Sequence, residues 1–435
     1  MSHEQASMTL LPKLSGPVRV YRFKQPDSGL SSLPSPIRKL PAEILAEIFA
    51  FCLPTHHCAV VHTSHAPLIF GRVCSAWRAT SISTPALWST IHFIVPPLIR
   101  GQNAVARLKG YDAIRIWLGR SGTLPLSISL EVGSTNFDDN LRSLVDILIP
   151  YRRQWKSLRL VGRTCGRLCG FGPLRPEDVP LLETLDIFED IPDLDPEFFG
   201  FISVPPNLRH LSLRFYSCGK PMPPCRWARI TSLRLECCNS FFQLDDSTLI
   251  EILERCVNLR SCRLCFPIGP RLRSNSMSTQ QQMITLGHLH TLSMNADVGV
   301  NAPFNMVRVL DRFVLPSLQT LELTGTIHDG RMSVHDRAPS RVAVLDMLRA
   351  INDVTTRSSS DLRVLSLELP AGQAAALIQF LRSCPGLTRL DLHCSRWGLV
   401  QPAPLDIRAV LVALADTDSA HPLCPNLLHL RLLLR

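Results

Sequence analysis

Residues 384–392 read Cys-Pro-Gly-Leu-Thr-Arg-Leu-Asp-Leu, and the pattern in this short stretch decides the fold of most of the chain. Its leucines follow the spacing Leu-x-x-Leu-x-Leu. In an extended strand alternate side chains point to opposite faces, so Leu390 and Leu392 point to one side and Asp391 points to the other. The stretch therefore predicts a strand that is apolar and buried on one face and polar on the other.

Close relatives of this pattern recur along the chain as a tandem repeat. The middle leucine advances by 22 to 30 residues from copy to copy, apart from two longer steps of 44 and 40 residues. One unit of this length cannot bury its own apolar face, so each unit must stack on its neighbours. The copies are Leu126-Ile128-Leu130, Trp155-Leu158-Leu160, Leu182-Leu185-Ile187, Leu208-Leu211-Leu213, Ile230-Leu233-Leu235, Leu259-Cys262-Leu264, Leu289-Leu292-Met294, Leu318-Leu321-Leu323, Leu362-Leu365-Leu367, Leu387-Leu390-Leu392 and Leu427-Leu430-Leu432.

The segments between the strands change to a helical period. Residues 249–255, 342–351 and 374–381 carry apolar residues at the spacing of amphipathic helices. A cysteine stands three residues before the first leucine at Cys256, Cys384 and Cys424. These features resemble the cysteine-containing leucine-rich repeats that often follow an F-box, although the steps are irregular. The resemblance implies an α/β fold, with a short all-α module followed by a horseshoe-shaped repeat solenoid.

The outward positions of the stacked strands should form polar rows on the concave face. We expect the first row to hold Arg159, Asp186, Ser212, Arg234, Arg263, Ser293, Glu322, Ser366, Asp391 and Arg431. The second row is Ser157, Thr184, His210, Ser232, Ser261, Thr291, Thr320, Val364, Arg389 and His429. Both charge signs occur, which favours a protein or peptide target over nucleic acid. The candidate target-binding residues are Arg159, Asp186, Arg234, Arg263, Glu322 and Asp391. Arg234 and Arg263 would suit an acidic or phosphorylated segment, and the alternative is that they are solvated surface side chains.

The chain before the repeats has a helical pattern. Residues 42–49 place Ile44, Leu45, Ile48 and Phe49 on one stripe, and Pro41 stands at the first turn of that helix. A second helix is expected over 68–80, and residues 86–91 close the module. About fifty residues could hardly bury so many apolar side chains alone, so this surplus predicts a permanent partner helix.

Three blocks in this region resemble the F-box. They are residues 40–49 (Leu-Pro-Ala-Glu-Ile-Leu-Ala-Glu-Ile-Phe), 73–78 (Val-Cys-Ser-Ala-Trp-Arg) and 85–88 (Pro-Ala-Leu-Trp), while the link over 52–67 is longer and richer in histidine than usual. The combination is similar to F-box proteins of the fungal type with C-terminal leucine-rich repeats. It implies docking on the Skp-type adaptor of a cullin-RING ubiquitin ligase. The adaptor contacts would be Leu40, Pro41, Ile44, Leu45, Ile48, Phe49, Val73, Trp77, Leu87 and Trp88.

Composition limits the class of protein. The chain has 435 residues, 46% apolar and 19% charged, and its 15 cysteines are scattered singly. Residues 1–16 carry polar and charged side chains where a signal peptide would be apolar, so we expect an intracellular protein of the cytoplasm or nucleus with free thiols. The uncharged stretch over 79–99 is interrupted by prolines, which argues against a membrane span. Of the net charge of +10, +8 falls in residues 1–130, so the repeats lack the basic excess of a nucleic-acid-binding array.

Motifs for catalysis are missing from the sequence. Cysteines and histidines gather over 52–74, but their spacing matches no paired zinc knuckle, so a solvated loop is the favoured interpretation and no metal or cofactor is expected. Cys262 and Cys265 should point to opposite faces of a strand, which argues against joint metal binding.

The sequence therefore predicts a non-enzymatic, substrate-recognition subunit of an SCF-type ligase. Its expected parts are a leader over 1–36, an F-box-like domain over 37–93, a connecting helix over 94–123 and a repeat array over 124–435. The expected partners are the Skp-type adaptor, a cullin through it, and an unidentified target protein. The alternative is an interaction scaffold without a ligase role, in which the N-terminal helices merely cap the array.

Overall fold

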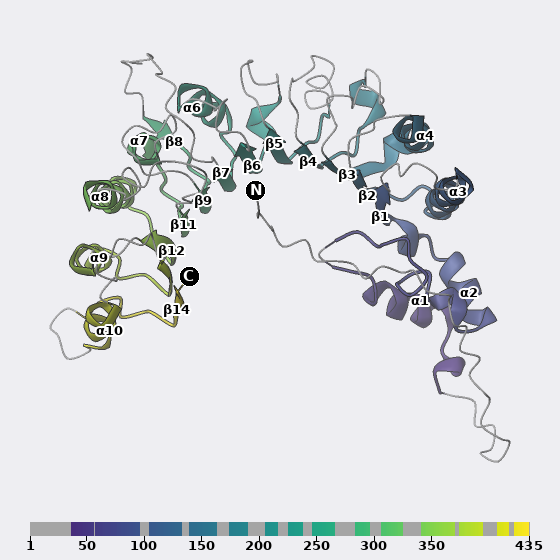
Figure 1. The fold of residues 1–435 in the computed structure, drawn as a ribbon, viewed down its shortest axis with the longest axis horizontal. Helices are drawn as coiled ribbons and strands as arrows, with labels where there is room; N and C mark the ends of the chain where they lie inside the picture. The colour runs from purple at the N-terminus through teal and green to yellow at the C-terminus, as the bar shows by residue number, and fades with distance from the viewer. Residues whose placement is uncertain are drawn as a thin grey trace, which may run out of the picture.

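The chain forms a mixed α/β structure around one long parallel sheet (Figure 1). The computed structural model describes residues 36–55, 57–95, 104–132, 139–162, 174–189, 205–215, 225–237, 246–265, 283–295, 306–324, 341–369, 374–394, 407–416 and 422–434. No helix among these residues has the length and apolar character needed to cross a bilayer.

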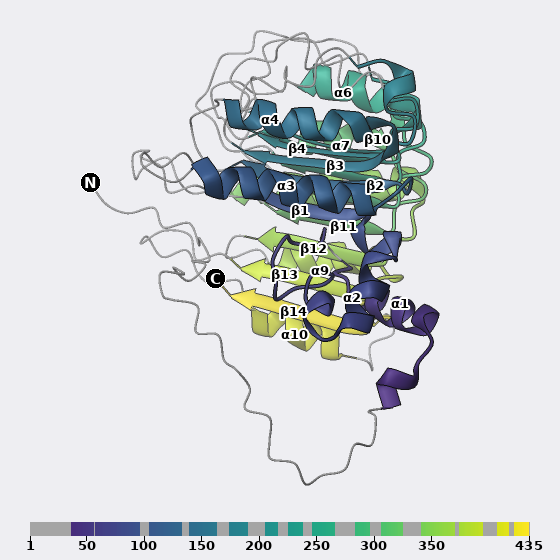
Figure 2. The same ribbon diagram turned by 90° about the vertical axis from the view of Figure 1, so that its right-hand side faces the viewer.

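Twelve of the described strands pair in parallel to form the main sheet, and each lies beside its neighbour in sequence. They are β1 (Thr90–Val95), β2 (Leu126–Val132), β3 (Trp155–Gly162), β4 (Thr184–Glu189), β5 (His210–Phe215), β6 (Ser232–Cys237), β7 (Ser261–Cys265), β9 (Thr291–Asn295), β11 (Thr320–Thr324), β12 (Val364–Leu369), β13 (Arg389–Cys394) and β14 (His429–Leu434). Figure 2 shows β11 to β14 side by side and pointing in the same direction. Two short strands, β8 (Ile284–Thr285) and β10 (Phe313–Val314), make a separate parallel pair.

Helices cover the outer side of the curved sheet, and the strands line its inner side (Figure 1). Parallel strands lie about 4.8 Å apart, whereas a helix with its side chains is about 10 Å wide. The outer layer of helices therefore takes up more length than the inner layer of strands. The structure curves, with the strands on its inner, concave side (Figure 1). The outer elements are α3 (Ala104–Arg120), α4 (Asp139–Leu148), α6 (Asp246–Arg255), α7 (Met306–Asp311), α8 (Arg341–Ser358), α9 (Ala374–Arg382) and α10 (Ile407–Ala415), with 3-10 turns η4 (Ile149–Gln154), η6 (Pro176–Asp178) and η7 (Trp227–Arg229).

A helical segment lies at the N-terminal end of the sheet. It consists of η1 (Pro36–Lys39), α1 (Ala42–Phe51), η2 (Phe70–Arg72), α2 (Ser75–Ile82) and η3 (Pro85–Trp88). The single helix expected over 68–80 is two pieces, because Cys74 has an extended backbone and caps α2, its Sγ accepting a hydrogen bond from the Trp77 amide. This cap starts a new helix at Ser75.

The sheet begins earlier than the sequence suggested. Thr90–Val95 was expected to close the helical module and start the connection, yet it pairs with β2 in register, Ile91 opposite Ile128 and Phe93 opposite Leu130. Trp88 and Trp117 are both buried, with ring centroids 5.0 Å apart at an interplanar angle of 81°. Trp88 Nε1 donates to the Ser81 carbonyl at 2.7 Å, and Trp117 Nε1 donates to the Thr90 carbonyl at 3.1 Å. The helical segment and the sheet therefore share one core.

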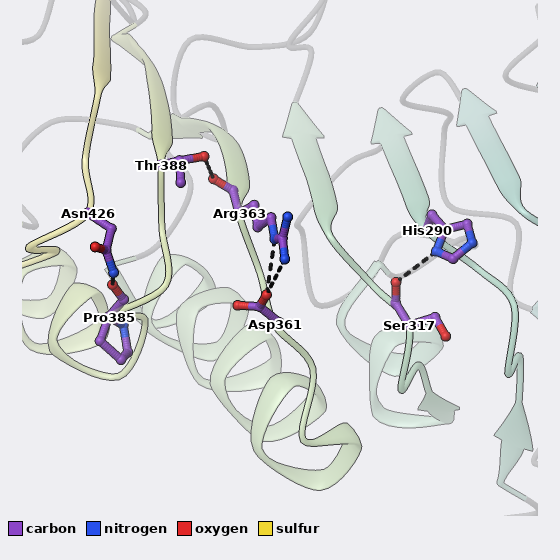
Figure 3. Close-up of polar contacts among 7 residues, drawn as sticks. All are labelled: His290, Ser317, Asp361, Arg363, Pro385, Thr388 and Asn426. Carbon is purple, nitrogen blue, oxygen red and sulfur yellow. Dashed lines mark hydrogen bonds and ion pairs between the residues drawn. The ribbon is translucent and has the colours of Figure 1, made fainter.

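Side chains just before several of the strands form hydrogen bonds to the neighbouring repeat. Asn207 and Asn258 donate through Nδ2 to the carbonyls of Pro180 and Ala228, each at 2.7 Å. Figure 3 shows the C-terminal members of this edge, where Asn426 Nδ2 donates to the Pro385 carbonyl at 3.2 Å and Thr388 Oγ1 donates to the Arg363 carbonyl at 3.1 Å. The asparagine side chains in this way supply donors to the loop carbonyls of Pro180, Ala228 and Pro385, while the Thr388 hydroxyl adds to the backbone hydrogen bonds that the Arg363 carbonyl already accepts.

Gly386, just before β13, lies close to Asp361 in the segment before β12. A Cβ atom at Gly386 would lie 2.6 Å from Asp361 Oδ1, so a side chain there would force the Asp361 carboxylate to move. Asp361 also accepts a hydrogen bond from Arg363 Nε at 3.0 Å (Figure 3).

Candidate protein-binding surfaces

Helix α1 is apolar on two sides. Leu45 and Phe49 point inward and are buried, while Ile44, Ile48 and Phe51 follow one another at i, i+4 and i+7 and are 43%, 37% and 88% exposed. A surface helix normally carries one apolar stripe and one polar face. The second, exposed stripe of α1 is the candidate docking face of the helical segment.

The inward stripe of α1 packs on aromatic rings. The ring of Phe49 stacks on Phe70 with centroids 4.0 Å apart and an interplanar angle of 9°, and the ring of Trp77 lies 4.9 Å from it. Because these rings fill the space between α1 and α2, Phe49 supports the docking face from behind without being part of it.

The ten residues predicted to contact an adaptor fall into two groups by their exposure, and four of them lie below the surface. Leu45, Phe49, Leu87 and Trp88 are buried in the core, because they join α1 to α2 and the module to the sheet. The other six keep some surface: Pro41, Ile44, Ile48 and Val73 are exposed, and Leu40 and Trp77 are half-buried against the core.

Sequence reasoning missed exposed apolar residues near the same helices. Phe51, Ile69 and Ile82 are exposed, and the prediction did not include them. Phe51 could have been found by extending the spacing of Ile44 and Ile48 by one more turn, whereas nothing local separates the exposed Ile69 from the buried Phe70.

The inner face of the sheet carries the two rows that the periodicity predicted, and the strand register confirms both alignments. Arg159 lies opposite Asp186, Asp186 opposite Ser212, and Ser212 opposite Arg234. The row continues through Arg263, Ser293, Glu322, Ser366, Asp391 and Arg431. It also extends backward through Ser129 to His92, which the prediction did not include.

A cluster of charged and aromatic side chains lies over β3 to β6. The guanidinium carbons of Arg159 and Arg234 each lie 5.2 Å from the centre of the Phe188 ring. Arg234 Nε also donates to Glu236 Oε1 at 2.7 Å, and Glu236 lies 3.7 Å from Arg214. Burial raises the pKa of the Asp186 carboxyl, although the charges of Arg159 and Arg234 act in the opposite direction. Phe188, in a third row beside the two predicted ones, was missed because its role depends on arginines from two other strands.

The C-terminal half of the inner face is arranged differently. Asp391 accepts hydrogen bonds from Arg389 Nε at 3.0 Å and Arg389 Nη2 at 2.9 Å, and this pairing raises the pKa of Arg389. Glu322 lies on β11, two strands from Asp391. Of the predicted target-binding residues here, Asp391 is therefore largely buried and paired within its own strand, and Glu322 is half-buried.

The cysteine- and histidine-rich link was considered as a metal site. His62 and His65 have ring centroids 5.4 Å apart, and Cys58 donates to the Ser127 carbonyl at 3.5 Å. In the described part of the chain, which omits His56, no three His, Cys, Asp or Glu side chains come close enough to share a metal ion. Burial raises the pKa of the thiols of Cys256 and Cys424 to about 12, so both are neutral in the core.

No protein-family model matches this chain, and no curated protein matches it either. The candidate surfaces are therefore defined by their own geometry: the exposed stripe of α1 at one end of the sheet, and the charged rows on its inner face.

Proposed function

We propose that this protein is an F-box protein with leucine-rich repeats that recognises the target of a cullin-RING ubiquitin ligase. The helical segment would dock on a Skp-type adaptor, and the inner face of the repeats would hold the target. The observation that carries the proposal is the exposed apolar stripe of α1. The motif blocks over 40–49, 73–78 and 85–88 supply the identity of the expected partner.

The energetics of the α1 stripe favour a permanent helical partner. Removing one large apolar side chain from water stabilises a complex by as much as about 1.5–3 kcal/mol. Three such side chains on one helix face resemble the i, i+4, i+7 anchors by which helices bind one another. Since Leu45 and Phe49 already fill the inner side of α1, the module does not need Ile44, Ile48 and Phe51 for its own core.

The shared core supports a positioning role. The packing of Trp88 on Trp117 joins the helical segment to α3, and Trp117 also donates a hydrogen bond to the Thr90 carbonyl at the start of β1. Figure 1 shows α1 and α2 beyond β1, at one end of the arc. A target bound to the inner face would then have a fixed position relative to an adaptor bound to α1. The contribution of the protein is proximity, which needs no catalytic residue of its own.

The test uses the full chain and a purified Skp-type adaptor. We expect Ile44→Asp and Ile48→Asp each to weaken adaptor binding at least 100-fold, because a charge would replace a buried anchor. Val412→Asp is the matched control, since Val412 is an exposed apolar residue on α10, in the C-terminal part of the array. Circular dichroism would check that each variant remains folded.

Two outcomes would contradict the proposal. If the wild-type chain does not bind the adaptor, or if both α1 variants bind it as well as Val412→Asp does, the ligase role is lost. The chain would then be an interaction scaffold whose N-terminal helices close the end of the sheet.

A further inference from the structure

The cluster over β3 to β6 encloses a hollow on the inner face of the sheet. Its volume is about 180 Å³, and its lining includes Arg159, Asp186, Phe188, His210, Ser212 and Arg234. These residues come from four successive strands, so the hollow exists only when the repeats are stacked.

The two arginines of the hollow are held in place before any ligand arrives. Arg159 approaches Phe188 from β3 and Arg234 approaches it from β6, each at 5.2 Å from the ring centre. Such cation–π contacts fix the position of a guanidinium without using its N–H donors. Arg234 donates hydrogen bonds to Glu236 with some of its N–H groups. Its other N–H groups and those of Arg159 are available to a ligand.

A buried hydroxyl in the same hollow needs a partner. Ser212 is only 6% exposed, and its Oγ has no hydrogen-bond partner among the described residues. An unpaired buried polar group costs free energy, which a ligand atom or an ordered water would recover. Ser212 lies between Asp186 and Arg234 in the strand register and lines the same hollow, so a group bound between the arginines would lie beside it.

The chemistry of the lining selects an acceptor. Two guanidiniums and hydroxyls such as that of Ser212 donate, and Asp186 is the one carboxylate in the described lining. The formal charge of this lining is +1, and it stays +1 when the adjacent Arg214–Glu236 pair is added. A carboxylate carries one negative charge and balances this site, whereas a phosphate dianion would leave it with an excess negative charge beside Asp186.

We propose that the hollow binds a glutamate or aspartate side chain of an extended protein segment. The bound carboxylate lies between Arg159 and Arg234 and accepts a hydrogen bond from Ser212. This inference rests on the proposed function in one respect, because it takes the inner face of the sheet as the target-binding surface. It adds the class of side chain recognised and the position that recognises it.

The test presents the purified full chain with decapeptide libraries that have random flanks and one fixed central residue. The fixed residue is glutamate, aspartate, glutamine, phosphoserine or lysine. We expect glutamate and aspartate to be retained about tenfold more than glutamine, since a hydrogen bond to a charged group is worth about that factor or more. The double variant Arg159→Ala with Arg234→Ala should lose this preference. Arg255→Ala, which removes an exposed arginine of α6, should keep it.

Ser212→Ala separates recognition from structure. Because the buried hydroxyl has no partner among the described residues, its removal should not lower the melting temperature, while the preference for glutamate should fall several-fold. Asp186→Asn raises the charge of the lining to +2, so it should shift the preference from glutamate toward phosphoserine. A residue with a merely structural role would not produce that exchange.

Three results would overturn the inference. They are equal retention of glutamate and glutamine by the wild-type chain, stronger retention of phosphoserine than glutamate by the wild-type chain, and an unchanged preference in the double arginine variant. Since the libraries contain no adaptor, each of these results leaves adaptor binding through α1 intact. Loss of adaptor binding, in turn, leaves the peptide preference to be judged on its own.

Discussion

Two leucines at the same position of neighbouring repeats allow a matched test of how the array ends. Leu390 on β13 and Leu430 on β14 lie opposite each other in the strand register. Leu390 is fully buried, whereas Leu430 is 38% exposed because no described strand covers the outer edge of β14. The same substitution, leucine to alanine, should therefore have different costs at the two sites.

The difference follows from burial. Leu→Ala removes three carbons, and at about 0.8 kcal/mol for each buried methylene the transfer cost is about 2.4 kcal/mol. At Leu390 an enclosed cavity adds to this cost, so we expect a total loss of about 3–4 kcal/mol. At Leu430 roughly three fifths of the transfer cost applies and the site is open, so we expect a loss of about 1.5 kcal/mol.

Urea unfolding followed by circular dichroism measures the two losses. The comparison is valid where both variants keep the wild-type slope of free energy against urea, because a stacked array can lose cooperativity. We expect Leu390→Ala to lose about 2 kcal/mol more than Leu430→Ala. Equal losses would refute the reasoning, because they would mean that Leu430 is covered in solution by a second copy or by further protein. Repeating the measurement after dilution would identify a second copy.

Two further predictions concern ionisable groups. Hydrogen bonds from the Arg175 amide and from Arg152 lower the pKa of Asp178, so its stabilising effect is present above the usual carboxyl range and is lost as pH falls through the lowered value. Asp178→Asn should therefore reduce the melting temperature at pH 7 and have little effect near pH 2, and an equal reduction at both pH values would contradict this. In the native protein iodoacetamide should label the exposed Cys52 but not the buried Cys256 or Cys424. Treatment with a chelator should leave the melting temperature unchanged. A melting temperature that falls with chelator would instead indicate a metal held by the 52–74 link.

The rows on the inner face could be predicted from the sequence alone because they depend on a local rule. Alternate residues of a strand point to opposite faces whatever the neighbours are, and parallel strands with the same apolar pattern align in register. Arg159, Asp186, Ser212 and Arg234 therefore stand where the spacing put them. The buried leucines of the repeats follow from the same rule.

The helical segment was harder to predict because the inward face of a helix depends on what lies beside it. Ile44, Leu45, Ile48 and Phe49 form one broad apolar stripe in sequence, and the packing of Phe49 on Phe70 and Trp77 divides it into a buried half and an exposed half. No local pattern distinguishes the two halves, because all four residues are large and apolar.

The sequence by itself determined the repeat, its strand positions and the side chains that share the inner face, because those follow from periods of two residues and of about 27. Only the tertiary structure decided that β1 belongs to the sheet, that Trp88 packs on Trp117, and that Arg159 and Arg234 both contact the Phe188 ring. Each of these depends on contacts between residues far apart in the chain or on different strands, and such contacts exist only once the repeats have stacked.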